Sequence, residues 1–246
     1  MNGWFSTSEG LLVSSVDEDQ MREVDRIAID ETGPALFQMM ENAGRNLALQ
    51  CLSMLGSEWK SSTIVVLAGT GGNGGGGICA ARHLANRGAN VHLCVSSVER
   101  LGDVPKYQRH IYQGTTGKEC SLEELPAEVD IVIDAILGYS LKGAPRGIAF
   151  EMIKWANAAG APLLSLDIPS GVNSTTGETP GEFIKATTTM TLALPKTGLH
   201  NSFINGNVML ADIGIPQKTY DILGIDYQSP FGSEYRIPLN FQGDHS

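Results

Sequence analysis

The chain has 246 residues, of which 42% are hydrophobic, and this suffices for one α/β domain with a substantial core. Its 17 Lys and Arg residues stand against 27 Asp and Glu residues, and the net charge of -10 argues against a nucleic-acid-binding or anionic-membrane surface. Any phosphate ligand must therefore be held by local donors such as backbone amides.

Two amphipathic helices are predicted near the N-terminus, after a loose tail at residues 1–14. Ser15 and Glu18 have the spacing of a capping box, which predicts the start of the first helix. Pro34 predicts the start of the second. The Met and Leu stripe of this second helix, residues 36–55, is typical of a core or of a subunit interface.

A glycine-rich segment follows the first predicted strand. Residues 64–68 are a short β-branched run, residues 69–77 contain only two side chains, and helical spacing of apolar residues continues to residue 87. Glycines permit positive φ and close approach of amides to a ligand, and a helix N-terminus attracts anions. The segment also matches G-x-G-x-x-G. A flexible linker is the alternative, but linkers rarely separate a buried strand from an amphipathic helix.

Strands and helices alternate along the rest of the chain, which predicts a mostly parallel sheet with helices on both faces. Strands are expected at residues 64–68, 90–95, 129–134, 162–167, 188–193 and 207–211, and helices at 77–87, 103–112, 148–159 and after Pro216. We expect one domain over residues 15–227 and an irregular C-terminal tail at residues 228–246.

Polar residues cluster where these strands end. Asp134 and Asp167 each close an apolar strand, and Ser170 and Asn73 lie in the adjoining turns. In an open α/β sheet that edge lines the ligand crevice. Each Asp could instead cap a local turn. Together the oxygen donors suit a hard cation or acid–base catalysis, whereas Ser170 lacks the G-x-S-x-G context of a hydrolytic nucleophile.

Other classes of protein are disfavoured. An NAD-dependent dehydrogenase needs an acidic residue at the end of its second strand, where this chain has Ser96 and Ser97. The four cysteines are widely spaced without C-x-x-C, which predicts reduced core thiols in a cytoplasmic protein. The five histidines show no H-x-x-x-H or Cys/His pairing, so no zinc site is expected. No apolar run has membrane-spanning length, and no signal or transit peptide is recognisable.

Several motifs resemble one known family, the NAD(P)HX epimerases or YjeF N-terminal domain family, over about residues 15–225. The resemblance rests on MREVDR (21–26), MENAG (40–44), the glycine segment 69–77, AARHL (80–84), DAILG (134–138) continuing to Gly147, DIPSG (167–171) and LPKTG (194–198). It implies a Rossmann-like three-layer α/β/α sandwich, a homodimer, and interconversion of the R and S forms of hydrated NADH and NADPH (NADHX and NADPHX).

The same resemblance implies the residues of the site. One potassium ion per subunit is expected at Asn73, Asp134 and Ser170. From the proton transfer that the reaction needs, we expect Asp167 to be the acid/base. The nucleotide is expected to contact Gly72, Asn73, Gly74, Gly75, Gly76, Gly138, Tyr139, Ser140, Leu141, Lys142, Gly143, Ala144 and Asp167. A separate NAD(P)HX dehydratase would act downstream, because the chain has no room for that domain.

The glycine segment departs from the family's usual Gly-Pro-Gly-Asn-Asn-Gly-Gly-Asp-Gly. Thr70 replaces Pro, Gly72 replaces the first Asn, and Gly76 replaces Asp. Two polar side chains are thereby lost from the nucleotide loop. The alternative to an epimerase is therefore a noncatalytic nucleotide- or protein-binding module of the same fold.

Overall fold

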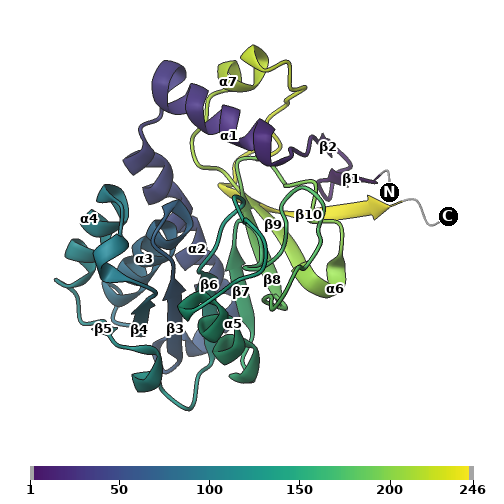
Figure 1. Cartoon of the computed structure of the whole chain (residues 1–246). Helices are drawn as coiled ribbons and strands as arrows, with labels where there is room; N and C mark the ends of the chain where they lie inside the picture. Colours follow the sequence, from purple (N-terminus) through teal and green to yellow (C-terminus); the bar gives the residue numbers. More distant parts are fainter. Residues whose placement is uncertain (1–2, 244–246) are drawn as a thin grey trace.

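A ten-stranded sheet forms the middle of the molecule in the computed structural model, which describes residues 3–243 (Figure 1). The strands are β1 (Gly3–Ser6), β2 (Leu12–Val13), β3 (Thr63–Ala68), β4 (Asn90–Val95), β5 (Lys118–Glu119), β6 (Ile131–Ala135), β7 (Leu163–Leu166), β8 (Thr188–Leu192), β9 (Asn207–Ala211) and β10 (Arg236–Gly243). Their order is β2-β1-β10-β9-β8-β7-β6-β3-β4-β5. Pairing is parallel from β9 to β5 and antiparallel among β2, β1, β10 and β9.

The helices follow the predicted alternation. They are α1 (Glu18–Ile27), α2 (Leu36–Leu55), α3 (Gly72–Ala85), α4 (Asp103–Tyr112), α5 (Ile148–Ala158), α6 (Ser202–Asn205) and α7 (Gln217–Ile222), with a π-helical turn at Ala28–Thr32 and 3-10 turns at Gly56–Lys60, Val98–Arg100 and Leu122–Glu124. The predicted mostly parallel α/β sandwich with two N-terminal helices is confirmed.

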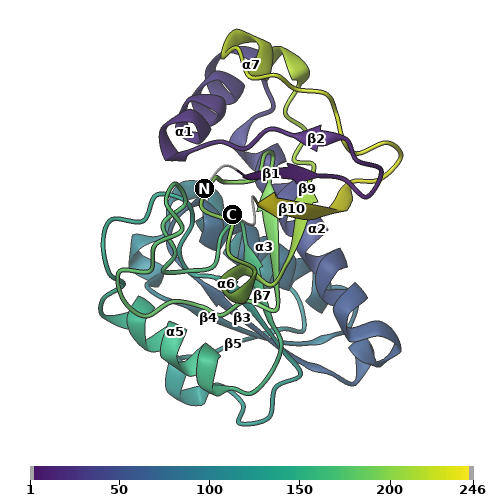
Figure 2. The same cartoon turned by 90° about the vertical axis from the view of Figure 1, so that its right-hand side faces the viewer.

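Helices cover both faces of the sheet, as Figure 2 shows for α2 and α5. Successive side chains of a strand point to opposite faces, so β3 contributes to two cores. Ile64 and Val66 lie in the core that includes residues of α2 and α3, whereas Val65 and Leu67 lie in the core that includes Met152 of α5. The apolar run of β3 is thus buried on both sides, as its sequence predicts.

The chain reverses its direction of travel across the sheet at β3. From β3 it passes to β4 at one side, and it then returns to β6 at the other side and continues through β7, β8 and β9. Such a reversal opens a crevice beyond the carboxyl ends of the two strands, here β3 and β6. The fold therefore places a ligand site between the segments that follow these strands.

The glycine segment differs from the prediction, because α3 begins at Gly72 rather than at residue 77. No glycine from 69 to 77 has positive φ. Most of these glycines serve close packing instead: a Cβ on Gly74 would meet the backbone of Gly69, and a Cβ on Gly77 would meet Ala135. The missing side chains bring the first turns of α3 against the β3 turn and β6.

Strands occur in both predicted tails, within residues 3–14 and 228–243, which corrects the expectation of a loose and an irregular segment there. The rest of both predicted tails, residues 1–2 and 244–246, lies outside the described residues. β1 pairs with β10, with Phe5 opposite Phe241 and their ring centroids 5.2 Å apart. Ile237 and Leu239 of β10 are buried. These strands are stabilised by a partner at the other end of the chain, so short-range sequence patterns do not reveal them.

The start of α1 also differs from the prediction. Asp17, not Ser15, is the N-cap: its Oδ1 accepts a hydrogen bond from the Gln20 amide at 2.8 Å, and the Gln20 side chain accepts one from the Asp17 amide at 3.1 Å. The helix thus begins with a capping box, as predicted, but the box is formed by Asp17 and Gln20, two residues after the predicted pair.

Candidate functional site

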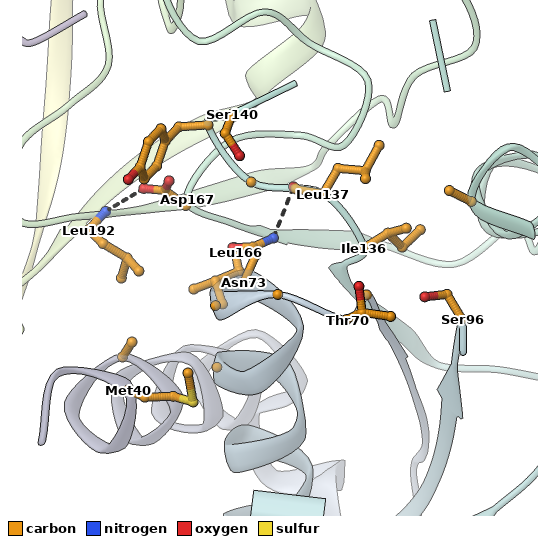
Figure 3. A pocket seen from close by; sticks show the side chains of 18 of the residues that line it. Met40, Thr70, Asn73, Ser96, Ile136, Leu137, Ser140, Leu166, Asp167 and Leu192 are labelled. Atoms are coloured by element: carbon orange, nitrogen blue, oxygen red, sulfur yellow. Dashed lines mark hydrogen bonds between the residues drawn. The ribbon is translucent and has the colours of Figure 1, made fainter. Parts of the chain in front are cut away.

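A cavity of about 570 Å³ lies at the crevice between the segments that follow β3 and β6. Its wall comes from α1, α2, the first turns of α3, the start of α5, and the segments at or after the ends of β3, β4, β6, β7, β8 and β9. Figure 3 shows the side chains that line it, with Asp167 at one side and Ser96 at the other. Asp167 and Ser96 thus lie at opposite ends of the cavity in this view, and the two ends differ in chemistry.

Asn73 joins the two sides of the crevice. Its Nδ2 donates a hydrogen bond to the carbonyl of Leu137 at 2.9 Å, which links the first turn of α3 to the segment after β6 (Figure 3). The Leu137 amide in turn donates to Ser170 Oγ at 2.8 Å. Both hydrogen bonds fix the backbone at Leu137 and Gly138, which line the cavity.

Asp134 lies behind this backbone and is fully buried. One carboxylate oxygen accepts from Ser170 Oγ at 2.5 Å and the other from Ser165 Oγ at 2.8 Å and the Ser170 amide at 2.9 Å. Burial raises the pKa of Asp134, and the hydrogen bonds from Ser170 and Ser165 oppose the rise. Among residues 3–243 no Lys, Arg or His forms an ion pair with this carboxylate.

Asp167 and Lys196 form a buried ion pair at the end of the cavity. Lys196 is 0% exposed and Asp167 is 4% exposed. Lys196 Nζ donates to Asp167 Oδ1 and also to the carbonyls of Leu192 at 2.9 Å and Leu194 at 3.2 Å. Asp167 has φ of 69°, a left-handed conformation that is uncommon outside glycine and that occurs at functional sites. The ion pair fixes the orientation of the Asp167 side chain at the cavity wall.

A second carboxyl, Asp25 of α1, lines the same cavity. Tyr139 donates its phenolic hydrogen to Asp25 Oδ2 at 2.7 Å, which ties the segment after β6 to α1. Burial raises the pKa of Asp25, and the hydrogen bond from Tyr139 opposes the rise. Burial and the charge of Asp25 raise the pKa of Tyr139, which stays a neutral donor.

Hydroxyl and basic side chains also line the cavity. Ser96, Ser97 and Arg100 line it from the segment after β4, and Arg146 lines it from the segment before α5. In the part of the chain that the structure describes, neither arginine forms an ion pair. In a chain of net charge -10, two guanidinium groups at one cavity favour an anionic ligand group there.

Some of the predicted site residues line the cavity and others do not. Those that line it are Gly72, Asn73, Gly76, Gly138, Tyr139, Ser140 and Asp167. Those that do not are Gly74, Gly75, Leu141, Lys142, Gly143, Ala144, Asp134 and Ser170. Gly74 and Gly75 are buried inside α3, and Lys142 and Gly143 are exposed at the tip of the loop. The structure thus joins Asn73 and Asp167 at one cavity and places Asp134 and Ser170 just behind its wall.

Sequence reasoning missed four charged groups of this site: Asp25, Lys196, Arg100 and Arg146. Asp25 and Lys196 belong to two motifs that carry the family resemblance, MREVDR and LPKTG. These motifs could have pointed to both residues, but the sequence analysis assigned neither of them a role. Arg100 follows β4 by five residues, at the sheet edge where a dehydrogenase carries its acidic residue.

A Cys/His pairing was also overlooked, because Cys79 and His83 are one helical turn apart on α3. With Glu41 of α2 they bring their ligand atoms within 4.8 Å of one another. Arg82 lies among them, with Nη2 2.6 Å from both carboxylate oxygens of Glu41 and 3.4 Å from Cys79 Sγ. Burial raises the pKa of the Cys79 thiol to about 12. This cluster therefore acts as a hydrogen-bonded tie between α2 and α3.

The fold and the cavity define a Rossmann-like α/β protein with a ligand site at its topological switch point. Over residues 36–198 the chain matches the family described as YjeF-related protein N-terminus. The NAD(P)H-hydrate epimerase of Dehalogenimonas lykanthroporepellens is 46% identical over 237 residues, which cover 96% of each chain. The chain belongs to this family, which confirms the resemblance noted from its motifs.

Two further comparisons bear on the fold and on domain composition. The Bifunctional NAD(P)H-hydrate repair enzyme Nnr of Hyperthermus butylicus is 36% identical over 202 residues, which cover 78% of this chain and 37% of that protein. The crystal structure of yeast ynu0, YNL200c, has a TM-score of 0.76 and 24% identity and covers 92% of this chain.

Between residues 3 and 243, no helix has the length and apolar character required to cross a membrane.

Proposed function

We propose that this chain is an isomerase, an NAD(P)H-hydrate epimerase that interconverts the R and S forms of NADHX and NADPHX. The observation that carries the proposal is the pair of carboxyls, Asp167 and Asp25, at one end of the switch-point cavity. The relative from Dehalogenimonas lykanthroporepellens supports it, because it is named for this activity and matches nearly the whole chain.

The two ends of the cavity suggest how the substrate lies. The hydrated nicotinamide ring, where the reaction occurs, is placed at Asp167 and Tyr139, and the phosphates are placed toward Arg100 and Arg146. Between the two ends, the backbone at Gly72 and Gly138 and the N-terminus of α3 face the ligand. Backbone amides and the helix dipole there replace the two polar side chains that the glycine segment lacks.

The chemistry requires proton transfer and no net redox change. In the hydrated cofactor a hydroxyl is attached to a ring carbon next to nitrogen. Once this hydroxyl is protonated, the nitrogen lone pair can expel it as water. The ring is then a planar iminium, and water that adds to the other face inverts the centre. Asp167 is a carboxylate at the cavity wall and is suited to exchange a proton with this hydroxyl.

We further propose that Asn73, Asp134 and Ser170 hold one potassium ion per subunit. The donor atoms fit this ion, because they are oxygens and because the buried Asp134 carboxylate has no cationic side chain as partner in the described residues. A bound cation would supply a positive charge beside the turn that carries Leu137 and Gly138. The protein itself fixes that turn through the hydrogen bonds of Asn73 and Ser170.

Two proposals concern partners. One is a separate dehydratase acting after this enzyme, supported by the relative of Hyperthermus butylicus, which is named as a bifunctional repair enzyme. The other is a homodimer, which sedimentation velocity would test. The Met stripe of α2 is a poor candidate for its interface, because Met39, Met40 and Leu47 are buried within the chain.

The test supplies a single epimer of NADHX or NADPHX and follows the appearance of the other by chromatography. We expect Asp167→Asn to lower the rate by about 100-fold or more, the usual contribution of general acid–base catalysis. Asn tolerates the positive φ at this position, and a thermal melt checks folding. Asp19→Asn, an exposed carboxyl on α1, is the matched control and should keep the wild-type rate.

Three outcomes separate the candidate functions. Wild-type protein that binds the nucleotide or a protein partner without speeding epimer exchange would indicate the noncatalytic module. A change of absorbance at the nicotinamide band with an alcohol or carbonyl substrate would indicate a dehydrogenase. Full activity of Asp167→Asn would contradict the role of Asp167.

A further inference from the structure

Asp25 and Asp167 line one cavity in contrasting electrostatic surroundings. Asp167 forms an ion pair with the buried ammonium of Lys196. Asp25 has no cationic partner within ion-pair distance in the described part of the chain, and its hydrogen-bonded neighbour is the neutral phenol of Tyr139. Two carboxyls whose surroundings favour opposite protonation states form the usual arrangement of an enzymatic acid and base.

The groups around Asp25 come from four elements. Tyr139 follows β6, Asp167 follows β7, Lys196 follows β8, and Tyr220 belongs to α7. Burial raises the pKa of Asp25, and the negative charge of Asp167 adds to the rise, while the Tyr139 hydrogen bond and the positive charge of Lys196 oppose it. Arg22, one turn earlier on α1, is engaged with Glu18 at 2.6 Å and Asp19 at 3.4 Å.

We propose that Asp25 is a second catalytic residue, which protonates the departing hydroxyl while Asp167 accepts a proton from the entering water. This inference rests on the epimerase function proposed above. It assigns the two carboxyls, which come from separate elements of the cavity wall, to the two faces of the ring. In the opposite direction of the reaction their roles exchange, so one site serves both epimers.

In one direction the reaction consists of loss of water from one face of the ring and addition of water to the other face. The carbon–oxygen bond breaks as the hydroxyl takes the proton of Asp25 and leaves as water, and the ring nitrogen lone pair forms the carbon–nitrogen double bond. A solvent water then forms a new carbon–oxygen bond on the other face and gives one proton to Asp167. Nothing is oxidised or reduced, and the net change in the protein is one proton moved from Asp25 to Asp167, which exchange with solvent restores.

The experiment compares Asp25→Asn with wild type and with Asp19→Asn, in the single-epimer assay and over a range of pH. We expect Asp25→Asn to lower kcat by about 100-fold or more. Its KM should stay within about threefold, because an amide keeps the size of the side chain and most of its polar contacts. Asp19→Asn should leave both constants unchanged, because Asp19 is exposed and does not line the cavity.

The pH profile distinguishes catalysis from a structural role. In wild type the rate should fall as pH rises through the pKa of Asp25, because the protonated acid is lost. Tyr139→Phe removes a hydrogen bond that lowers this pKa, so the alkaline limb of the profile should move to higher pH. A role of Asp25 limited to holding Tyr139 predicts instead that both variants lose rate equally at every pH.

The results distinguish a failure of the proposed epimerase function from a failure of the inference about Asp25. If the wild-type protein does not speed epimer exchange, the proposed function fails and Asp25 is not at issue. If the wild type is active and Asp25→Asn keeps its kcat and alkaline limb, the inference about Asp25 is refuted while the epimerase function stands. Loss of kcat in a variant whose melting temperature and NADPH binding match wild type supports it.

Discussion

Gly74 lets α3 lie close to the turn after β3, and replacing it with Ala should disrupt both stability and catalysis. A Cβ at this position would lie 2.5 Å from the carbonyl carbon of Gly69 and 2.8 Å from its nitrogen. The carbonyl oxygen of Gly69 lies nearer still, and ordinary van der Waals contact begins at 3.4 Å, so the backbones must separate by roughly 1 Å or more. Overpacking of this kind costs about 1–3 kcal/mol.

The same displacement moves the cavity wall, because Gly69 and the first turn of α3 both line the cavity. A misplacement of about 1 Å in an active site can cost on the order of 100-fold in rate. We therefore expect Gly74→Ala to lower the urea midpoint and to reduce kcat/KM by at least about tenfold. Urea unfolding and the epimer-exchange assay measure the two effects.

Gly72→Ala is the matched control, two residues away in the same glycine segment. A Cβ at Gly72 meets no atom within 4 Å, and Ala favours a helix over Gly by roughly 1 kcal/mol. This variant should be as stable as wild type or slightly more so. If Gly74→Ala and Gly72→Ala had the same urea midpoint and the same kcat/KM, the packing explanation would be refuted. The glycine segment would then be better described as a flexible loop.

Three other predictions concern the charged groups. Lys196→Met should cost about 3–5 kcal/mol, because it leaves the Asp167 carboxylate buried without its cation, and a loss below about 1 kcal/mol in urea unfolding would contradict this. Potassium chloride should raise the melting temperature of wild type above that in tetramethylammonium chloride, and Asp134→Asn should abolish the difference. Arg100→Ala should raise KM by about tenfold with little change in kcat, as expected for a lost contact to a substrate phosphate, and an unchanged KM would place the phosphates elsewhere.

Much of the fold follows from short-range patterns in the sequence. The β-branched run of β3 and the alternation of strands with helices predict the parallel sheet, and β4 and β9 have the predicted bounds. The start of α3 could not be predicted, because glycine has a low helix propensity that packing against Gly69 and Ala135 overrides. Propensity is a weak guide where tertiary contacts require the smallest residue.

Without the family resemblance, the site was predictable only where its residues end strands or lie in the adjoining turns. Asp134 and Asp167 close β6 and β7, so the sheet alone places them near Asn73. Asp25 lies on a helix that precedes the sheet, and Tyr139, its hydrogen-bond partner, is 114 residues away in the chain. No local pattern encodes a meeting over that separation, and the same holds for β1 and β10.

The pairing of β1 with β10 has a consequence for how the chain can be cut and joined. Gly3 lies opposite Gly243, so the first and last described residues are neighbours at one side of the molecule (Figure 1). A short peptide bridging these two positions would give a circular permutant whose new ends could open at the exposed Lys142–Gly143 tip. Deleting residues 3–6 would instead leave the long strand β10 with a bare edge that invites other chains to add to it.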